Sequence, residues 1–177
     1  YAEIGVSRLV IMGRDPALFE GLDSQKVMTM QRGWQNAIAH LFPRLIDENI
    51  WSLGAVPIQA WADKVFPDLP ASDRLEKLWD AVFAANRIYE DDPVAAWHAH
   101  NAQLHARRNY LNEKAYTAPH FSGDGTDLTI GLPQGHVWEG GSDTHSTGKA
   151  FFPNMPTEEI FTMPHRDKVN GTVKATK

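Results

Sequence analysis

The sequence predicts an α/β protein, in which a part built on a parallel sheet is followed by a β-rich part. Two short runs, residues 8–13 (RLVIMG) and 50–56 (IWSLGAV), have the continuous apolar character of strands that are buried on both faces. Residues with helical spacing separate these runs, and strand–helix–strand order favours parallel pairing. After about residue 115, glycine and proline become frequent and apolar residues alternate with others, which is typical of short strands and turns.

The first helix is predicted to follow the first apolar run, with Ser24 as its N-cap. Apolar residues recur at intervals of three and four along it, on one helical face: Val27, Met30, Trp34, Ile38 and Leu41. Gly33 weakens the interior of this helix without breaking the pattern. Pro43 then marks its end.

Two further helices are predicted after the second apolar run. Asp73 and Glu76 have the spacing of a capping box ahead of one of them. Asp92 and Pro93 open the other, in agreement with the preference of proline for the first helical position. Both helices carry apolar residues on one side: Leu75, Leu78, Trp79, Val82 and Phe83 in the first, and Val94, Trp97, Leu104 and Leu111 in the second.

The β-rich part begins with a half-buried strand in GTDLTIGL, where Leu128, Ile130 and Leu132 alternate with other residues. Turn residues follow in QGHVWEGGSDTHSTGK. We therefore place a domain boundary near residues 112–125, and predict that residues 1–115 and 116–177 belong to two different domains.

Composition limits the kinds of partner that this chain is expected to have. Its 177 residues carry a formal net charge of −5, and no basic block offsets this charge, so neither a nucleic acid nor an anionic membrane surface is an expected partner. The chain has no cysteine, which leaves carboxylate, imidazole and water as the possible metal ligands. With no long apolar run and no secretory signal, the sequence predicts a cytoplasmic protein. The missing initiator Met and the ending VKATK suggest a piece of a longer protein.

Three histidines in one predicted helix have the composition of a metal site but not its spacing. His98 and His100 lie about 200° apart around a helix, and His98 and His105 lie roughly 10.5 Å apart along its axis. Ligand bonds of about 2.0–2.1 Å cannot join them through one ion. We expect polar or partly packed histidines here.

The glycine-rich run GGSDTHSTGKA does not predict a phosphate loop or a nucleophile. The spacing between Gly141 and Gly148 is too long for a phosphate-binding loop, and Ala150 stands where a hydroxyl residue is required. Ser142, Asp143 and His145 are close in sequence, but proximity in sequence is not the geometry of a catalytic triad. A solvated turn is the expectation.

Two adjacent glutamates in PTEEIFT are the strongest candidates for a functional site. Thr157, Ile160 and Phe161 favour an extended conformation, in which Glu158 and Glu159 point to opposite faces. Glu159 then shares its face with Phe161 and Met163, where a carboxylate needs a cation or metal partner. This favours Glu159 as the functional residue, although a solvent-exposed strand without a function accounts for the same pattern.

His165 and Asp167 form an H-x-D pair just after Pro164. On spacing alone the pair could hold one metal ion. Its position after a proline favours a turn instead.

Several segments of the sequence resemble the thermophilic-type metalloaminopeptidases, the family of aminopeptidase T, aminopeptidase S and PepS. The signature PNMPTEEIFTMPHRDKVNG carries the resemblance most specifically. The helix WHAHNAQLHARRNYLN, the strand GTDLTIGL and the WEGG turn followed by FFPNMPTEE are also similar to this family. The resemblance covers essentially the whole chain.

This resemblance implies a cytoplasmic exopeptidase that forms homodimers and releases N-terminal residues from peptides with a free N-terminus. It implies two divalent metal ions (zinc, cobalt or magnesium), held by two glutamates, two histidines and an aspartate, with a tyrosine assisting. It also implies that residues 1–115 end an N-terminal α/β domain and that residues 116–177 begin a β-rich catalytic domain.

Carried over to this sequence, the first metal-ligating glutamate falls on Glu159, the second of the pair. The other ligands and all catalytic residues are expected downstream of this chain, and His165 and Asp167 stand at the wrong place in the order to be assigned. With one ligand, the chain alone is expected to be inactive. Two alternatives stay open: a non-catalytic α/β folding or dimerisation module, and a carboxylate-dependent hydrolase of another kind.

Overall fold

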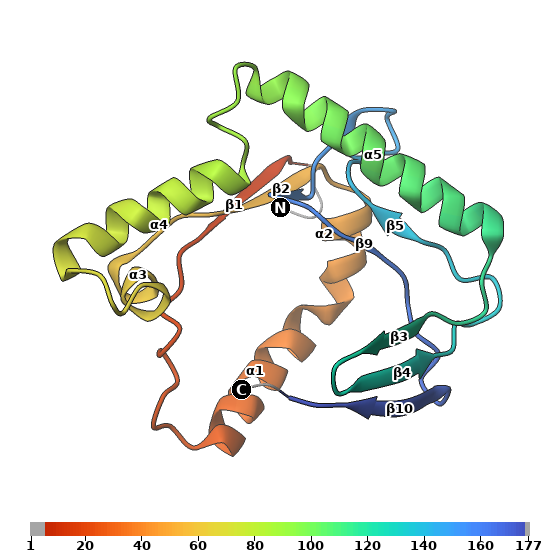
Figure 1. The fold of residues 1–177 in the computed structure, drawn as a ribbon, viewed down its shortest axis with the longest axis horizontal. Helices are drawn as coiled ribbons and strands as arrows, with labels where there is room; N and C mark the ends of the chain where they lie inside the picture. Colours follow the sequence, from red (N-terminus) through yellow and green to blue (C-terminus); the bar gives the residue numbers. More distant parts are fainter. Residues whose placement is uncertain (1–5, 176–177) are drawn as a thin grey trace. The chain divides into compact units, whose positions relative to one another are not determined.

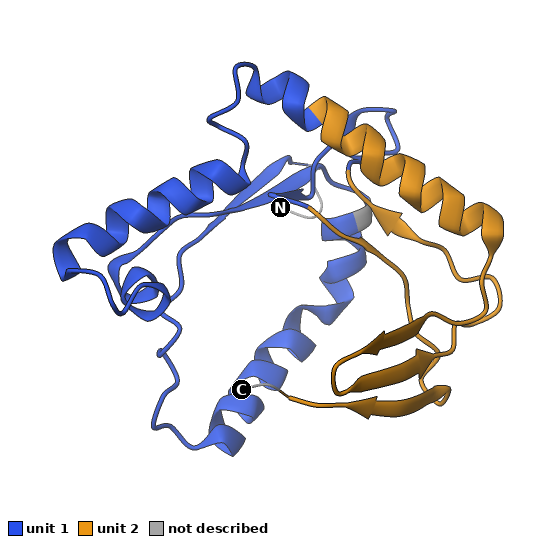
Figure 2. Cartoon of the chain, viewed as in Figure 1, with its two compact units in different colours: residues 1–97, 142–157 blue, residues 98–141, 158–177 orange. Residues whose placement is uncertain are grey.

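The computed structural model describes residues 6–175, apart from the side chain of residue 47. Its helices, parallel sheet and antiparallel sheets confirm the α/β class (Figure 1). The chain divides into two compact units, unit 1 with residues 1–97 and 142–157 and unit 2 with residues 98–141 and 158–177 (Figure 2). These units are assembled from interleaved segments, whereas the predicted domains were continuous. The domain division of the whole protein stays a prediction.

Unit 1 is built on a three-stranded parallel sheet in the order β1-β2-β8. Its strands are β1 (Arg8–Met12), β2 (Trp51–Ala55) and β8 (Asn154–Met155). The register pairs Arg8 with Trp51, and Leu53 with Asn154. Parallel pairing of the first two strands confirms the predicted strand–helix–strand unit. The two-residue β8 was not predicted, because it is too short to show a period.

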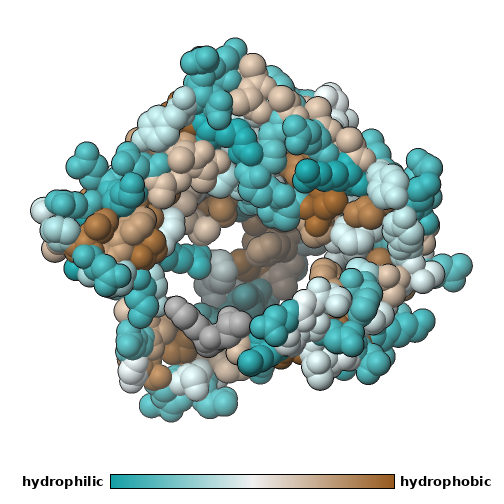
Figure 3. Space-filling model, viewed as in Figure 1, coloured by the Kyte–Doolittle hydropathy of each residue, from teal (hydrophilic) through white to brown (hydrophobic). Residues whose placement is uncertain are grey.

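The sequence predicted that strand β1 is buried on both faces, and this prediction is wrong. Leu9 is 68% exposed and Ile11 is 62% exposed, whereas Arg8, Val10 and Met12 are half-buried. Because side chains alternate between the faces of a strand, one face of β1 is open in this chain. Apolar side chains are also visible elsewhere on the surface of unit 1 (Figure 3).

The first helical region of unit 1 is longer and more divided than predicted. It consists of α1 (Ser24–Ile38), the 3₁₀ turn η1 (Ala39–Leu41) and α2 (Phe42–Asp47). Asp23, rather than Ser24, is the N-cap of α1, because its Oδ1 accepts hydrogen bonds from the backbone N–H groups of Gln25 and Lys26. Pro43 lies in the first turn of α2, where its missing N–H has no cost.

Three more helices follow: α3 (Gln59–Val65), which was not predicted, α4 (Ala71–Ala85) and α5 (Pro93–Lys114). The predicted capping box is wrong, because the helix already begins after Pro70 and Asp73 lies inside its first turn. Asp92 does cap α5, where its Oδ1 accepts from the backbone N–H of Ala95 at 3.0 Å. The α5 helix passes from unit 1 into unit 2 at His98.

Gly33 provides a test of the helical assignment of α1. It is exposed, and a Cβ atom added to it meets no atom within 4 Å. We expect Gly33→Ala to raise the free energy of unfolding of the 177-residue chain by roughly 0.5–1 kcal/mol, because alanine loses less backbone entropy in a helix. Urea unfolding followed by circular dichroism measures this, and lower stability would contradict a regular helix at this position.

Unit 2 contains a three-stranded antiparallel sheet in the order β10-β4-β3. Its strands are β3 (His120–Gly123), β4 (Thr126–Ile130) and β10 (Val169–Val173). The alternating burial of β4 confirms the predicted half-buried strand. Strand β3 was missed, although Asp124 and Gly125 form the two-residue turn that joins it to β4, and an Asp-Gly pair between strands is a hairpin signal.

In unit 2 a second, two-stranded antiparallel ribbon joins β5 (Glu139–Gly140) to β9 (Ile160–Phe161). Leu104 of α5 is the most completely buried side chain of this unit, with 1% exposure. Among the described residues, no helix combines the length and the apolar character of a membrane span.

Candidate functional site

The two glutamates lie immediately before β9, in an irregular segment rather than inside a longer strand. Only Ile160 and Phe161 pair with β5, through Gly140 and Glu139 respectively. The predicted extended strand is therefore shorter than the sequence pattern suggested. Pro156 and Pro164 flank the segment and cannot donate to a ladder, and its partner β5 is only two residues long.

The carboxylates of the two glutamates have different partners. Oε2 of Glu158 lies 3.2 Å from Nε2 of His100, a residue of α5. Oε2 of Glu159 accepts a hydrogen bond from the backbone N–H of Glu158, also at 3.2 Å. The side chains of Phe161 and Met163 are exposed, so burial against them does not by itself single out Glu159. The assignment of Glu159 as a metal ligand stays a prediction.

Polar side chains of α5 hold the first strand of the ribbon. Asn112 binds the backbone of Trp138 twice: its Oδ1 accepts from the N–H group at 2.7 Å, and its Nδ2 donates to the carbonyl oxygen at 3.0 Å. Arg108 donates to the carbonyl oxygen of Gly140 at 3.5 Å and lies 3.9 Å from Oε2 of Glu139. These residues follow one another at helical spacing, so one stripe of α5 fixes β5.

Two consecutive glycines allow the close approach of three chain segments. A Cβ at Gly140 would lie 2.5 Å from the carbonyl oxygen of Glu159, and Gly140 has a φ of +141°. A Cβ at Gly141 would lie 2.6 Å from Oδ1 of Asn101 and 3.0 Å from Cδ2 of His105. The glycine pair thus brings the backbone next to Glu159 on one side and next to α5 on the other.

The histidines of α5 have separate surroundings. His98 is exposed, His100 contacts Glu158, and the ring of His105 lies next to Gly141. Within residues 6–175, no group of three or more His, Asp or Glu side chains lies close enough together to hold a metal ion. A complete metal site is therefore not formed by the part of the chain that the structure describes.

His165 and Asp167 lie in a turn ahead of β10, as predicted. The backbone N–H of Asp167 donates to Nδ1 of His165 at 3.2 Å, and the backbone N–H of Lys168 donates to the carbonyl oxygen of His165. The N–H of His165 itself donates to the carbonyl oxygen of Gly131 at 2.7 Å. One ring nitrogen of the histidine thus stabilises the turn.

The glycine-rich run forms a hairpin of unit 1, with strands β6 (Asp143–Thr144) and β7 (Ala150–Phe151). Nδ1 of His145 pairs with the hydroxyl of Thr147 at 2.8 Å, and Nε2 pairs with the carbonyl oxygen of Glu48 at 2.9 Å. Oδ1 of Asp143 accepts from the backbone N–H of Thr144. These contacts stabilise the turn between β6 and β7, and the predicted turn is thus confirmed.

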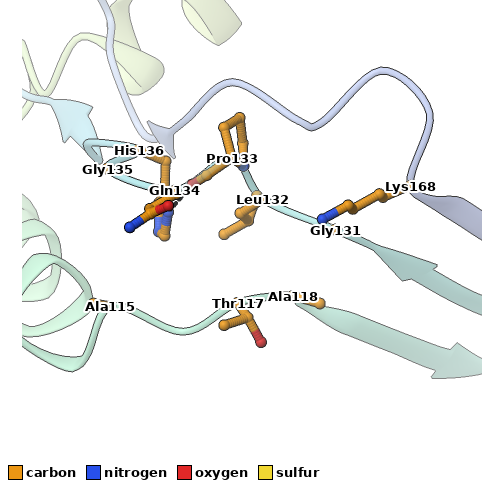
Figure 4. Close-up of a pocket in the computed structure, with 10 residues that line it drawn as sticks. All are labelled: Ala115, Thr117, Ala118, Gly131, Leu132, Pro133, Gln134, Gly135, His136 and Lys168. Atoms are coloured by element: carbon orange, nitrogen blue, oxygen red, sulfur yellow. Dashed lines mark hydrogen bonds between the residues drawn. The ribbon is translucent and has the colours of Figure 1, made fainter.

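A cavity of about 550 Å³ lies elsewhere in unit 2, lined by residues that follow β4 and that precede β3 and β10 (Figure 4). Residues 131–136 form one of its walls (Figure 4). The side chain of Lys168 extends along Gly131, and the segment with Ala115, Thr117 and Ala118 forms the opposite wall (Figure 4). Neither glutamate lines this cavity.

Sequence reasoning missed the α5 residues that contact Glu158 and the segment around β5. The roles of His100, Arg108 and Asn112 depend on contacts with residues far along the chain. Polar residues three and four apart, from Asn101 through His105 and Arg108 to Asn112, were the available signal that this side of α5 packs against a polar segment.

Comparison with known proteins adds the family context. The model of the family described as "Thermophilic metalloprotease (M29)" matches residues 1–177. The chain is 42% identical over 174 residues to aminopeptidase T of Thermus aquaticus, covering 98% of this chain and 43% of that protein. It is 44% identical over 177 residues to aminopeptidase 2 of Geobacillus stearothermophilus, covering 99% and 43%.

A solved structure, wild-type AmpT from Thermus thermophilus, matches with a TM-score of 0.87 and 40% sequence identity. The match covers 99% of this chain and 43% of that one. The chain therefore spans less than half the length of the relatives that it matches.

Proposed function

The chain belongs to the thermophilic metalloprotease (M29) family, and we propose that it is part of a metal-dependent aminopeptidase that releases N-terminal amino acids from peptides. The observation that carries this proposal is the identity of 42% and 44% to two proteins named aminopeptidases, along nearly the whole of this chain. Because the match spans 43% of each relative, the activity is proposed for the full-length protein and not for the 177 residues alone.

Glu159 is the residue of this chain that we propose as a metal ligand. Its carboxylate is exposed and accepts one backbone hydrogen bond, so oxygen lone pairs are available for a cation. Carboxylates suit zinc, cobalt and magnesium alike. One carboxylate cannot hold such an ion alone, and the remaining ligands and a catalytic tyrosine are proposed to lie downstream, with none of the catalytic residues in this chain.

The proposed site holds two divalent ions. When bound, such ions lower the pKa of water and polarise the scissile carbonyl of a peptide. This chain contributes a carboxylate on a segment that is tied to α5 and β5, which keeps the ligand in one place. In the proposal, residues 1–115 end an N-terminal α/β domain, residues 116–177 begin a β-rich catalytic domain, and the protein is a cytoplasmic homodimer.

A second candidate is a non-catalytic α/β folding or dimerisation module. The observation that favours it is the lack of any group of three potential metal ligands within residues 6–175.

Hydrolysis of leucine and arginine para-nitroanilides separates the two candidates. The 177-residue chain and a C-terminally extended chain are assayed with added zinc, cobalt or magnesium. We expect activity only in the extended chain and only with metal. An extended chain that stays inactive with every metal would refute the aminopeptidase proposal. Full activity in the short chain would refute the proposal that the remaining ligands lie downstream.

A further inference from the structure

The segment that carries Glu159 is positioned by polar contacts rather than by burial. Both glutamates are exposed, and so is Phe161 of the short strand that follows. Ile160 is half-buried, whereas burial does not hold the two glutamates, so their orientation depends on hydrogen bonds. Those bonds come from α5 and from β5.

The contact between His100 and Glu158 is the anchor nearest to the proposed ligand. The side chain of His100 is only 14% exposed, whereas that of Glu158 is 57% exposed. His100 is carried by the long helix α5, and its Nε2 pairs at 3.2 Å with the more accessible carboxylate of Glu158. The direction of support is therefore from His100 to Glu158.

Glu158 connects the contact with His100 to Glu159. Its side chain is held by His100, and its backbone N–H donates to Oε2 of Glu159 at 3.2 Å. Glu158 therefore takes part in both contacts, in one through its side chain and in the other through its backbone. A shift of Glu158 would move the donor that orients the carboxylate of Glu159.

The opposite side of the segment is already fixed. Ile160 pairs with Gly140 in the ribbon, and the hydroxyl of Thr162 donates to the carbonyl oxygen of Val137 at 2.6 Å. Strand β5 is itself held by Asn112 through Trp138. His100 is thus a point at which α5 contacts the residue that precedes Glu159.

Resting on the proposed function, we infer that His100 is a positioning residue for the metal-binding carboxylate of Glu159 and that it acts through Glu158. Groups that orient a metal ligand without touching the metal affect affinity and activity by about 10- to 100-fold. His100 belongs to this class and makes no contact with substrate or metal in this assignment.

The test uses the full-length protein and measures zinc affinity by competition with a chromophoric chelator. The visible absorption of the cobalt-loaded protein reports the ligand geometry in the same variants. We compare His100→Ala, Glu158→Ala and the double variant. His100→Gln is the conservative variant, because its amide can donate to the same carboxylate. His98→Ala, at an exposed position of the same helix, is the matched control.

We expect His100→Ala and Glu158→Ala each to weaken zinc binding by about 10- to 100-fold and to change the cobalt spectrum. The double variant is expected to bind zinc no more weakly than either single variant, because both changes remove the same contact between His100 and Glu158. His100→Gln should restore most of the affinity, and His98→Ala should match the unmodified protein. kcat is expected to fall with little change in KM.

Three results would overturn this inference while leaving the aminopeptidase proposal intact. The first is unchanged zinc affinity and an unchanged cobalt spectrum in His100→Ala. The second is additive losses in the double variant, which would mean that the two residues act separately. The third is an equal loss in His100→Gln and His100→Ala. An unmodified full-length protein that binds no metal would instead overturn the proposed function.

Discussion

Glu159→Gln in the full-length protein is expected to lower kcat by at least on the order of 10³-fold, because glutamine lacks the charge of a carboxylate ligand. Glu158→Gln is expected to lower kcat by less than about 10-fold. At this position glutamine keeps an oxygen that can accept from His100, and its backbone N–H still reaches Oε2 of Glu159. The two glutamates are adjacent and both exposed, so they form a matched pair of substitutions.

Steady-state hydrolysis of leucine para-nitroanilide measures kcat, and elemental analysis of the purified variants measures the bound metal. Glu159→Gln should lose metal together with activity, while Glu158→Gln should keep both. Equal losses at the two positions would show that Glu159 is not the particular ligand. Full metal content in an inactive Glu159→Gln variant would show that Glu159 has a catalytic role other than that of a metal ligand.

Gly140→Ala is expected to lower the free energy of unfolding of this chain by about 3 kcal/mol or more. A methyl group there would lie 2.5 Å from the carbonyl oxygen of Glu159 and 3.0 Å from Cα of Ile160, both of which are backbone atoms. The backbone at this position also has a φ of +141°, which a residue with a Cβ rarely adopts. Relief of this clash requires separation of β5 from β9.

Gly135→Ala is the control for backbone strain alone. Gly135 has a φ of +77°, and a Cβ there meets no atom within 4 Å. A loss of about 1–2 kcal/mol is expected from its left-handed conformation. Urea unfolding of both variants of the 177-residue chain gives the difference. Equal losses would mean that the clash expected at Gly140 costs nothing beyond backbone strain.

Local sequence patterns were sufficient for most of the regular structure. Apolar residues spaced three and four apart predicted α1, and Asp92 with Pro93 predicted the start of α5. Two apolar runs predicted the parallel strands β1 and β2. These signals succeed because a helical or strand period is carried by neighbouring residues and does not depend on the rest of the fold.

Short strands and exact cap positions needed the tertiary structure. Strand β8 has two residues and exists because it pairs with β2, and β9 exists because it pairs with β5. Asp23 and Ser24 are both good N-caps by type, and only the backbone conformation selects Asp23. The expectation that β1 is buried on both faces was wrong for the same reason: an apolar run records what a strand can bury, not what covers it.

For the candidate site, the sequence by itself singled out the PTEEIFT segment, and family resemblance directed attention to Glu159 within it. The tertiary structure decided what supports that residue: His100 through Glu158, and two glycines that let β5 approach. Glu158 is 58 residues away from His100 along the chain, and no local pattern encodes a contact of that kind. Such a contact depends on how α5 and the ribbon pack, which is a property of the folded chain and not of any segment read alone.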